Sequence, residues 1–289
     1  MIPSSEPSAD GPSTDAVEDR PGRPDGAARI AAAFAATERR AALMPYLMGG
    51  FPDLPTSAEV GRAYADGGAS LVELGVPYSD PLADGPVIHS AGSAALRNGA
   101  TVEGVLGVAE QLAERLPVVL MCYANLLYAR GLEEFAAALA DHGVSGLIVP
   151  DVPLEEAPLV RAACDAAGVA LVPLIAPTTP EPRLEAIGAL ARGFLYTVSV
   201  AGTTGERRQV DDSVGALVER ARAYTNVPVA VGFGVGTPEQ ARAVADAGAD
   251  GVIVGSRLVR EVAEAVETSS DPAEAVLKLI TRFAAALDR

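Results

Sequence analysis

The chain has 289 residues, of which 49% are hydrophobic, so it can bury a sizeable core and wholesale disorder is excluded. Lys and Arg number 22 against 38 Asp and Glu, and the formal net charge of -16 disfavours nucleic acid and anionic lipid as partners. The sequence has no apolar run near the roughly 20 residues that a membrane span requires, so no membrane association is expected.

Residues 1–26 are acidic and rich in proline, with almost no large apolar side chain. Such a composition buries too little surface to offset the entropy of ordering, so we expect a disordered tail. No apolar stretch follows a basic one, so we expect no secretory signal and a cytoplasmic protein. A helix is expected from residue 27 to about residue 40, with Ile30 and Phe34 four positions apart on one face.

From residue 42 onward, short apolar runs alternate with Ala-rich stretches of helical period. Eight runs are nearly continuously hydrophobic, as strands buried on both faces must be: 42–50, 70–76, 116–123, 145–152, 169–177, 193–200, 227–234 and 250–256. Four helix ends share one plan, in which a glycine stops the helix before an aliphatic strand: Gly68, Gly143, Gly168 and Gly248.

Repeated βα units over residues 27–289 predict an α/β fold, a (β/α)8 TIM barrel with an extra N-terminal helix and the disordered N-terminal tail. An open doubly wound sheet is the alternative. Its G-x-G-x-x-G fingerprint would follow the first strand, whereas this strand ends in the sequence MGGFP.

The inventory of reactive side chains narrows the chemistry. The single lysine, Lys278, lies near the C-terminus, which disfavours Schiff-base catalysis, and two histidines, His89 and His142, are too few for a usual catalytic metal site. Both histidines are expected to be structural or solvated. Cys122 and Cys164 lie in apolar runs and are expected to be buried thiols. Carboxylate acid–base chemistry remains.

Glu73 lies inside the second aliphatic run, where an unpaired carboxylate is costly. The alternation of a strand points Glu73 the same way as Leu71 and Gly75, into the barrel. We interpret it as an acid/base with a raised pKa, and the alternative is a structural glutamate held by amides or an arginine. The loop that follows carries Asp80 and Asp84, either of which is a turn residue or the second carboxylate of the pocket.

Glycine-rich turns follow the sixth, seventh and eighth predicted strands, at 201–205, 232–236 and Gly255-Ser256, with no Lys or Arg inside them. Backbone N–H groups in such turns can approach an anion closely, which predicts a phosphate site. Plain tight turns are the alternative. Tyr196 on the sixth strand either faces the lumen or is a core aromatic.

One segment, LVELGVPYSDPLADGPVI, resembles the strand 2 signature of the tryptophan synthase alpha subunit family. Supporting matches are MCYANLLY, IVPDVPLEE, VSVAGTTG, VGFGVGTPEQ and VIVGS, in the same order along the chain. The resemblance runs from about residue 27 to the C-terminus. It implies a lyase of tryptophan biosynthesis that cleaves indole-3-glycerol phosphate to indole and D-glyceraldehyde 3-phosphate by a retro-aldol reaction.

The resemblance also implies roles for particular residues. Glu73 matches the catalytic acid/base, Asp84 the aspartate that stabilises the indole N–H, and Tyr196 a tyrosine beside the glutamate. Matches to the substrate phosphate-binding positions are Gly205, Gly234, Gly255 and Ser256.

Further matches concern the lid loop and the partner. Thr204 matches a lid-loop threonine, whereas Val200 departs from the arginine that many members carry there. Asp80 and Asn125 match the interface with a beta subunit, so an alpha2beta2 heterotetramer is expected, with no metal or cofactor in this chain and pyridoxal phosphate only in the beta subunit. A free-standing indole-3-glycerol-phosphate lyase, a non-catalytic phosphate-binding activator and another phosphosugar barrel enzyme are the alternatives.

Overall fold

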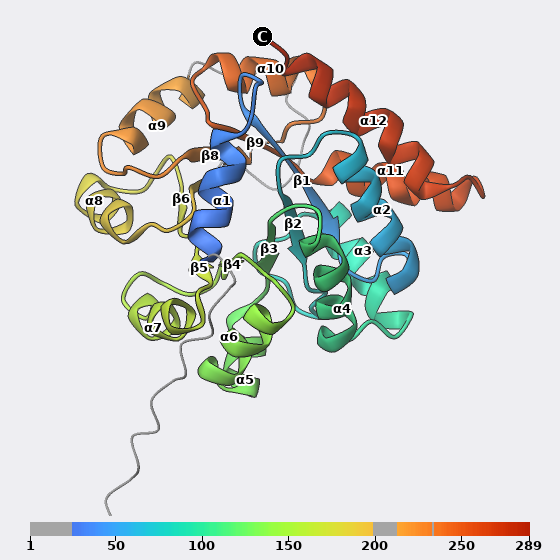
Figure 1. The fold of residues 1–289 in the computed structure, drawn as a ribbon, viewed down its shortest axis with the longest axis horizontal. Coiled ribbons are helices and arrows are strands. Elements are labelled where there is room, and N and C mark those ends of the chain that lie inside the picture. Colours follow the sequence, from blue (N-terminus) through green and yellow to red (C-terminus); the bar gives the residue numbers. More distant parts are fainter. Residues whose placement is uncertain (1–24, 199–212, 233) are drawn as a thin grey trace, which may run out of the picture.

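The computed structural model of the chain describes residues 25–198, 213–232 and 234–289. Its strands form one parallel sheet in the order β5-β4-β3-β2-β1-β9-β8-β7-β6, surrounded by helices (Figure 1). In chain order the strands are β1 (Ala42–Met48), β2 (Val72–Gly75), β3 (Val118–Met121), β4 (Gly146–Ile148), β5 (Ala170–Leu171), β6 (Leu174–Ile175), β7 (Leu195–Val198), β8 (Val229–Gly232) and β9 (Gly251–Val254).

The barrel closes where β5 runs into β6. β5 pairs with β4, whereas β6 pairs with β7 on the other side. Between them, the Val172 N–H donates to the Leu147 carbonyl at 2.9 Å, and the Pro173 carbonyl accepts from the Tyr196 N–H at 3.0 Å. Proline has no N–H to donate, so the run expected as one strand over 169–177 is divided into two short strands. With this segment counted as one strand, the predicted (β/α)8 barrel is confirmed.

The helices that the structure describes connect these strands. They are α1 (Gly26–Ala35), α2 (Leu54–Asp66), α3 (Pro86–Arg97), α4 (Val102–Ala113), α5 (Ala124–Arg130), α6 (Leu132–Asp141), α7 (Ala157–Ala167), α8 (Glu181–Leu190), α9 (Ser213–Arg222), α10 (Pro238–Asp246), α11 (Ser256–Glu267) and α12 (Pro272–Ala286). The repeated glycines behave as expected at the helix ends: all four have positive φ, and Gly168 is the left-handed cap of α7. None of these described helices is long and apolar enough to cross a membrane.

Helix α1 covers the amino-terminal end of the barrel, where Ile30 and Phe34 pack among inward-facing side chains. The helix is shorter than expected, since it ends at Ala35 rather than near residue 40. Its first residue, Gly26, is buried and donates its N–H to the Gly168 carbonyl at 2.8 Å. Gly26 was expected in the tail but belongs to the folded part. The rest of the expected tail, residues 1–24, lies outside the described residues.

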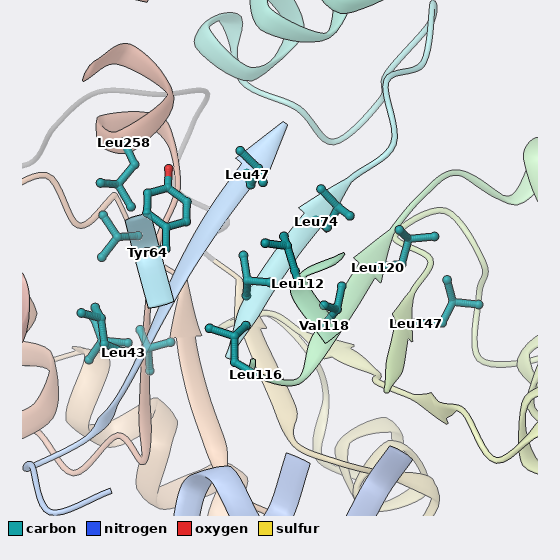
Figure 2. Close-up of a cluster of buried hydrophobic side chains, with 14 of the residues drawn as sticks. Leu43, Leu47, Tyr64, Leu74, Leu112, Leu116, Val118, Leu120, Leu147 and Leu258 are labelled. Carbon is teal, nitrogen blue, oxygen red and sulfur yellow. The ribbon is translucent and has the colours of Figure 1, made fainter. Parts of the chain in front are cut away.

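The main core lies between the outer face of the sheet and the helices. Figure 2 shows this layer, to which strands β1 to β4, the helices α2, α4 and α11 and the connection before β3 contribute Leu43, Leu47, Tyr64, Leu74, Leu112, Leu116, Val118, Leu120, Leu147 and Leu258. A second cluster fills the barrel interior with the alternate residues of the strands, such as Met44 and Val119. Burial on both faces explains why every residue of β1 is buried, and it directs Tyr46, Glu73 and Tyr196 inward.

Candidate active site

A cavity of about 1480 Å³ opens at the carboxyl ends of the strands. Its lining includes six of the residues predicted from sequence: Glu73, Asp84, Tyr196, Gly234, Gly255 and Ser256. Thr204 and Gly205, predicted for the lid and the phosphate, lie outside the described residues, as does Val200. The cavity therefore collects the two carboxyl groups and the glycine turns in one space, as functional sites in this fold are arranged.

Glu73 is 2% exposed and lies beside Tyr46, its register partner on β1. Burial, opposed by a hydrogen bond with Tyr196 and reinforced by the nearby charge of Asp84, raises the pKa of the Glu73 carboxyl to about 8. Among the described residues, its Oε2 atom has no hydrogen-bond partner. Near neutral pH this carboxyl group is therefore mostly protonated and can donate a proton into the cavity.

Two glycines make room for the tyrosines that flank Glu73. A Cβ atom on Gly232 would lie 2.6 Å from the Tyr196 hydroxyl, and a Cβ atom on Gly75 would collide with the Tyr46 hydroxyl. Burial raises the pKa of both phenols well above 10, so both stay neutral. Tyr46 was not predicted as a site residue, although the alternation along residues 42–50 would have placed it inside the barrel.

Asp84 lies in the loop between β2 and α3, where Tyr123 holds it. The Tyr123 hydroxyl accepts a hydrogen bond from the Ala83 N–H at 3.0 Å and donates one to Asp84 Oδ1 at 3.1 Å. The Tyr78 ring stacks on the Tyr123 ring with centroids 5.1 Å apart. Burial raises the pKa of Asp84, whereas the Tyr123 hydrogen bond and the nearby His89 lower it.

Tyr123 is a second residue that sequence reasoning missed. It lies inside the quoted MCYANLLY segment, directly after β3, and a signal was available because strand ends of a barrel face the site. Its hydrogen bonds do two things: they fix the loop backbone at Ala83, and they favour the ionised form of Asp84. The two carboxyl groups of the cavity therefore differ in environment: Glu73 keeps one oxygen atom without a hydrogen-bond partner among the described residues, whereas Asp84 accepts a hydrogen bond from Tyr123.

The predicted partner-facing residues lie outside the cavity lining. Asp80 is exposed in the loop after β2 and accepts a hydrogen bond from the Ser79 hydroxyl at 2.5 Å. Asn125 is exposed on α5, whose first N–H, from Ala124, donates to Asp151 Oδ1 at 2.9 Å. Leu82, in the same loop as Asp80, is 85% exposed. A partner that bound this face could bury the exposed Leu82 side chain.

The amino-terminal end of α11 is open to an anion. Gly255 precedes α11 with no side-chain cap, and the first turn holds no acidic residue. A Cβ atom on Gly255 would meet no atom closer than 3.7 Å, so the fold itself does not require glycine there. The absence of a side chain leaves room for a ligand to reach the backbone N–H groups and the positive end of the helix dipole.

The neighbouring helix α10 is different, because its first amides are already satisfied. Gln240 Oε1 accepts hydrogen bonds from the Gly236 N–H at 2.7 Å and the Thr237 N–H at 3.1 Å, and Thr237 forms a capping box with Gln240. The anion-binding capacity of this edge of the cavity therefore lies at Gly234, Gly255 and Ser256 rather than at the start of α10.

The described residues contain no cluster of histidine, cysteine and carboxylate side chains that could hold a metal ion. Cys122 and Cys164 are buried free thiols, as expected, and burial raises the pKa of Cys164 to about 12. His142 hydrogen-bonds the Ala138 carbonyl within its own helix end at 2.8 Å, which agrees with its predicted structural role.

Known proteins match this chain over almost all of the barrel. The tryptophan synthase alpha chain family model matches residues 33–288. A tryptophan synthase alpha chain from Prochlorococcus marinus (strain MIT 9313) is 51% identical over 230 residues, which cover 79% of this chain and 84% of the relative.

Solved structures agree. A tryptophan synthase chain from Mycobacterium tuberculosis superposes with a TM-score of 0.82 at 37% identity, covering 90% of this chain and 98% of that one. A chain of the Pyrococcus furiosus tryptophan synthase a2b2 complex gives a TM-score of 0.79 at 34% identity, covering 84% and 98%. By sequence and by fold, the chain belongs to the tryptophan synthase alpha chain family, lyases of tryptophan biosynthesis.

Proposed function

We propose that this chain cleaves indole-3-glycerol phosphate to indole and D-glyceraldehyde 3-phosphate, with Glu73 as the acid/base of the retro-aldol step. The observation that carries the proposal is the buried Glu73 carboxyl, whose pKa of about 8 keeps it protonated at the cavity wall. Its Oε2 atom has no partner among the described residues, so the proton can be given to substrate without first breaking a hydrogen bond.

In the proposed mechanism, Glu73 protonates indole C3 and forms an indolenine that can accept the electrons of the breaking carbon–carbon bond. The resulting carboxylate then takes the proton of the neighbouring glycerol hydroxyl as the aldehyde forms, which restores the acid. Tyr196 keeps the Glu73 carboxyl oriented through its hydrogen bond. The electrons end on the indole ring, so this chain needs neither a metal nor a Schiff base.

Asp84 is proposed to accept a hydrogen bond from the indole N–H and to stabilise the positive charge that grows there. This role requires the ionised carboxylate. Burial works against ionisation, and the hydrogen bond from Tyr123 works for it. An anion held in a partly buried site stabilises such a developing charge more than water does.

The substrate phosphate is proposed to bind the backbone N–H groups at Gly234, Gly255 and Ser256. The uncapped start of α11 and the open space above Gly255 support this placement. Gly205 is proposed as a further phosphate contact and Thr204 as part of the lid, and both lie outside the described residues.

A beta subunit is the proposed partner, in an alpha2beta2 heterotetramer within the cytoplasm. The structural relative from Pyrococcus furiosus belongs to an a2b2 complex. Asp80 and Asn125 are exposed and offer polar side chains to such a partner. Pyridoxal phosphate belongs to the beta chain, so this chain supplies its chemistry from its own side chains.

The test is an indole-release assay on indole-3-glycerol phosphate, with and without a beta subunit. Release that rises strongly with the beta subunit supports the proposal. Release at full rate without a partner points to a free-standing lyase. No release, combined with activation of the beta subunit reaction, would identify a non-catalytic activator and refute the role of Glu73.

A further inference from the structure

We propose that Arg257 supplies a positive charge to the phosphate end of the cavity, and that Glu261 holds this charge while the site is empty. The inference rests on the proposed function and extends it beyond the backbone donors. Arg257 directly follows Ser256 in α11 and lines the same cavity as Gly234 and Gly255. It is the first residue beyond the glycine turns, which themselves hold no basic side chain.

Among the described residues, the hydrogen bonds of Arg257 are incomplete. Its Nη2 atom pairs with Glu261 Oε2 at 2.5 Å, one helical turn along α11. Its Nη1 atom is buried and has no hydrogen-bond partner among the described residues, and the Glu264 carboxylate approaches it only to 4.0 Å. A buried guanidinium N–H without an acceptor costs free energy, and an anion in the cavity would remove that cost.

The Arg257 side chain is placed to move between two acceptors, the Glu261 carboxylate and a phosphate bound in the cavity. The Arg257 side chain, which lines the cavity, is 24% exposed and that of Glu261 is 23% exposed, so neither is locked in the core. An i,i+4 ion pair on a helix is weak, whereas a hydrogen bond from a guanidinium to phosphate is among the strong ones, so a dianionic phosphate can compete for Arg257. The neutral donors at Gly255 and Ser256 would hold the phosphate in place, and Arg257 would close over it.

The charge of the whole chain makes such a residue useful. The substrate is an anion, whereas the chain carries a formal net charge of -16. Arg161, on α7, also lines the cavity and pairs with Asp165 at 3.3 Å. Like Arg257, Arg161 is a cavity-lining arginine with an i,i+4 carboxylate partner, but it belongs to α7 and is not part of the proposed phosphate site. It therefore serves as a matched control.

Four variants of the full chain test the proposal: Arg257→Gln, Glu261→Gln, the double variant and Arg161→Gln. Inorganic phosphate is titrated calorimetrically into each, and KM and kcat for indole-3-glycerol phosphate are measured by indole release. Loss of a charged hydrogen bond predicts that R257Q weakens phosphate binding by about tenfold, with the loss mainly in KM. Removal of the competing carboxylate predicts that E261Q tightens binding by about twofold.

A purely structural ion pair would move R257Q and E261Q in the same direction, whereas the proposal moves them in opposite directions. The gain from E261Q should also disappear in the R257Q background, because Glu261 acts through Arg257. The proposal is overturned if R257Q binds phosphate within twofold of the wild type, if R161Q weakens it equally, or if the gain from E261Q persists without Arg257. Absence of indole release by the wild type would refute the proposed function instead, and the phosphate titrations would still decide the role of Arg257.

Discussion

Replacing Glu73 by glutamine tests whether this carboxyl group is stored neutral inside the barrel. Its pKa is about 8 in the folded chain and ordinarily 4.5. Between these two pH values the unfolded chain releases a proton that the folded chain keeps, so the free energy of unfolding of the wild type falls as pH rises and levels off above about 8. The gap between the pKa values corresponds to about 5 kcal/mol in full and to about 3 kcal/mol at pH 7.

Glutamine is similar in shape to the protonated glutamate but cannot ionise. The free energy of unfolding of E73Q, relative to that of the wild type, should therefore increase as pH rises. The expected increase is about 3 kcal/mol between a pH below 4.5 and pH 7. Urea unfolding of both proteins at acid, neutral and alkaline pH measures the difference, in which the titration of all other groups cancels. Glu103→Gln is the control, because Glu103 is exposed and its hydrogen bond with Arg130 lowers its pKa. The difference in free energy of unfolding between E103Q and the wild type should therefore not rise with pH.

The same E73Q variant should lose turnover by about 10²- to 10⁴-fold, the usual contribution of a positioned acid/base. Phosphate affinity should remain, because Gly255 and Ser256 are unchanged. The combination of gained stability and lost activity distinguishes a buried catalytic acid from a structural glutamate, which would lose stability when altered. A stability difference that does not vary with pH, together with near wild-type indole release, would refute the reasoning.

Three further outcomes are expected. Tyr123→Phe removes the hydrogen bond that favours ionised Asp84, so the acid limb of the kcat profile should move to higher pH, whereas Tyr128→Phe on exposed α5 should leave the profile unchanged. Gly255→Ala should keep the thermal unfolding temperature and raise KM, since the added methyl group meets only ligand space; an unchanged KM would contradict the phosphate placement. Deleting residues 1–24 should leave indole release and unfolding temperature unchanged, and a large loss of either would show that the tail is functional.

The fold could be predicted because burial on both faces leaves a simple signal. β1 is apolar along its whole length, and each strand run is followed by a helical stretch. The way in which the barrel closes could not be predicted from this signal. The apolar run over 169–177 forms two short strands, of which the first pairs with β4 and the second with β7. The end of α1 was missed for a related reason: Arg39 and Arg40 favour a helix locally, but they bond Gly68 and Asp246 instead.

The candidate site could be predicted in part, because strand ends and glycine turns are visible in the chain order. Glu73 stands out as a charge in an apolar run, and Gly255-Ser256 follows the last strand. Strand alternation and a strand-end position could have directed Tyr46 and Tyr123 toward the site, but the contacts that make them important are with neighbours distant in sequence. Tyr123 reaches Asp84 across 39 positions, and no local pattern announces such a contact.

The surroundings of the two carboxyl groups in the cavity are consistent with the opposite roles proposed for them at one pH. Glu73 lies on a strand inside the barrel, where burial dominates and one oxygen has no partner in the described part of the chain, so the neutral form is favoured. Asp84 lies on a loop, where Tyr123 donates a hydrogen bond and His89 lies near, so ionisation is less opposed. Separated pKa values are what a donor of protons and a stabiliser of positive charge require. The division of labour therefore follows from position, strand against loop, since both residues carry the same functional group.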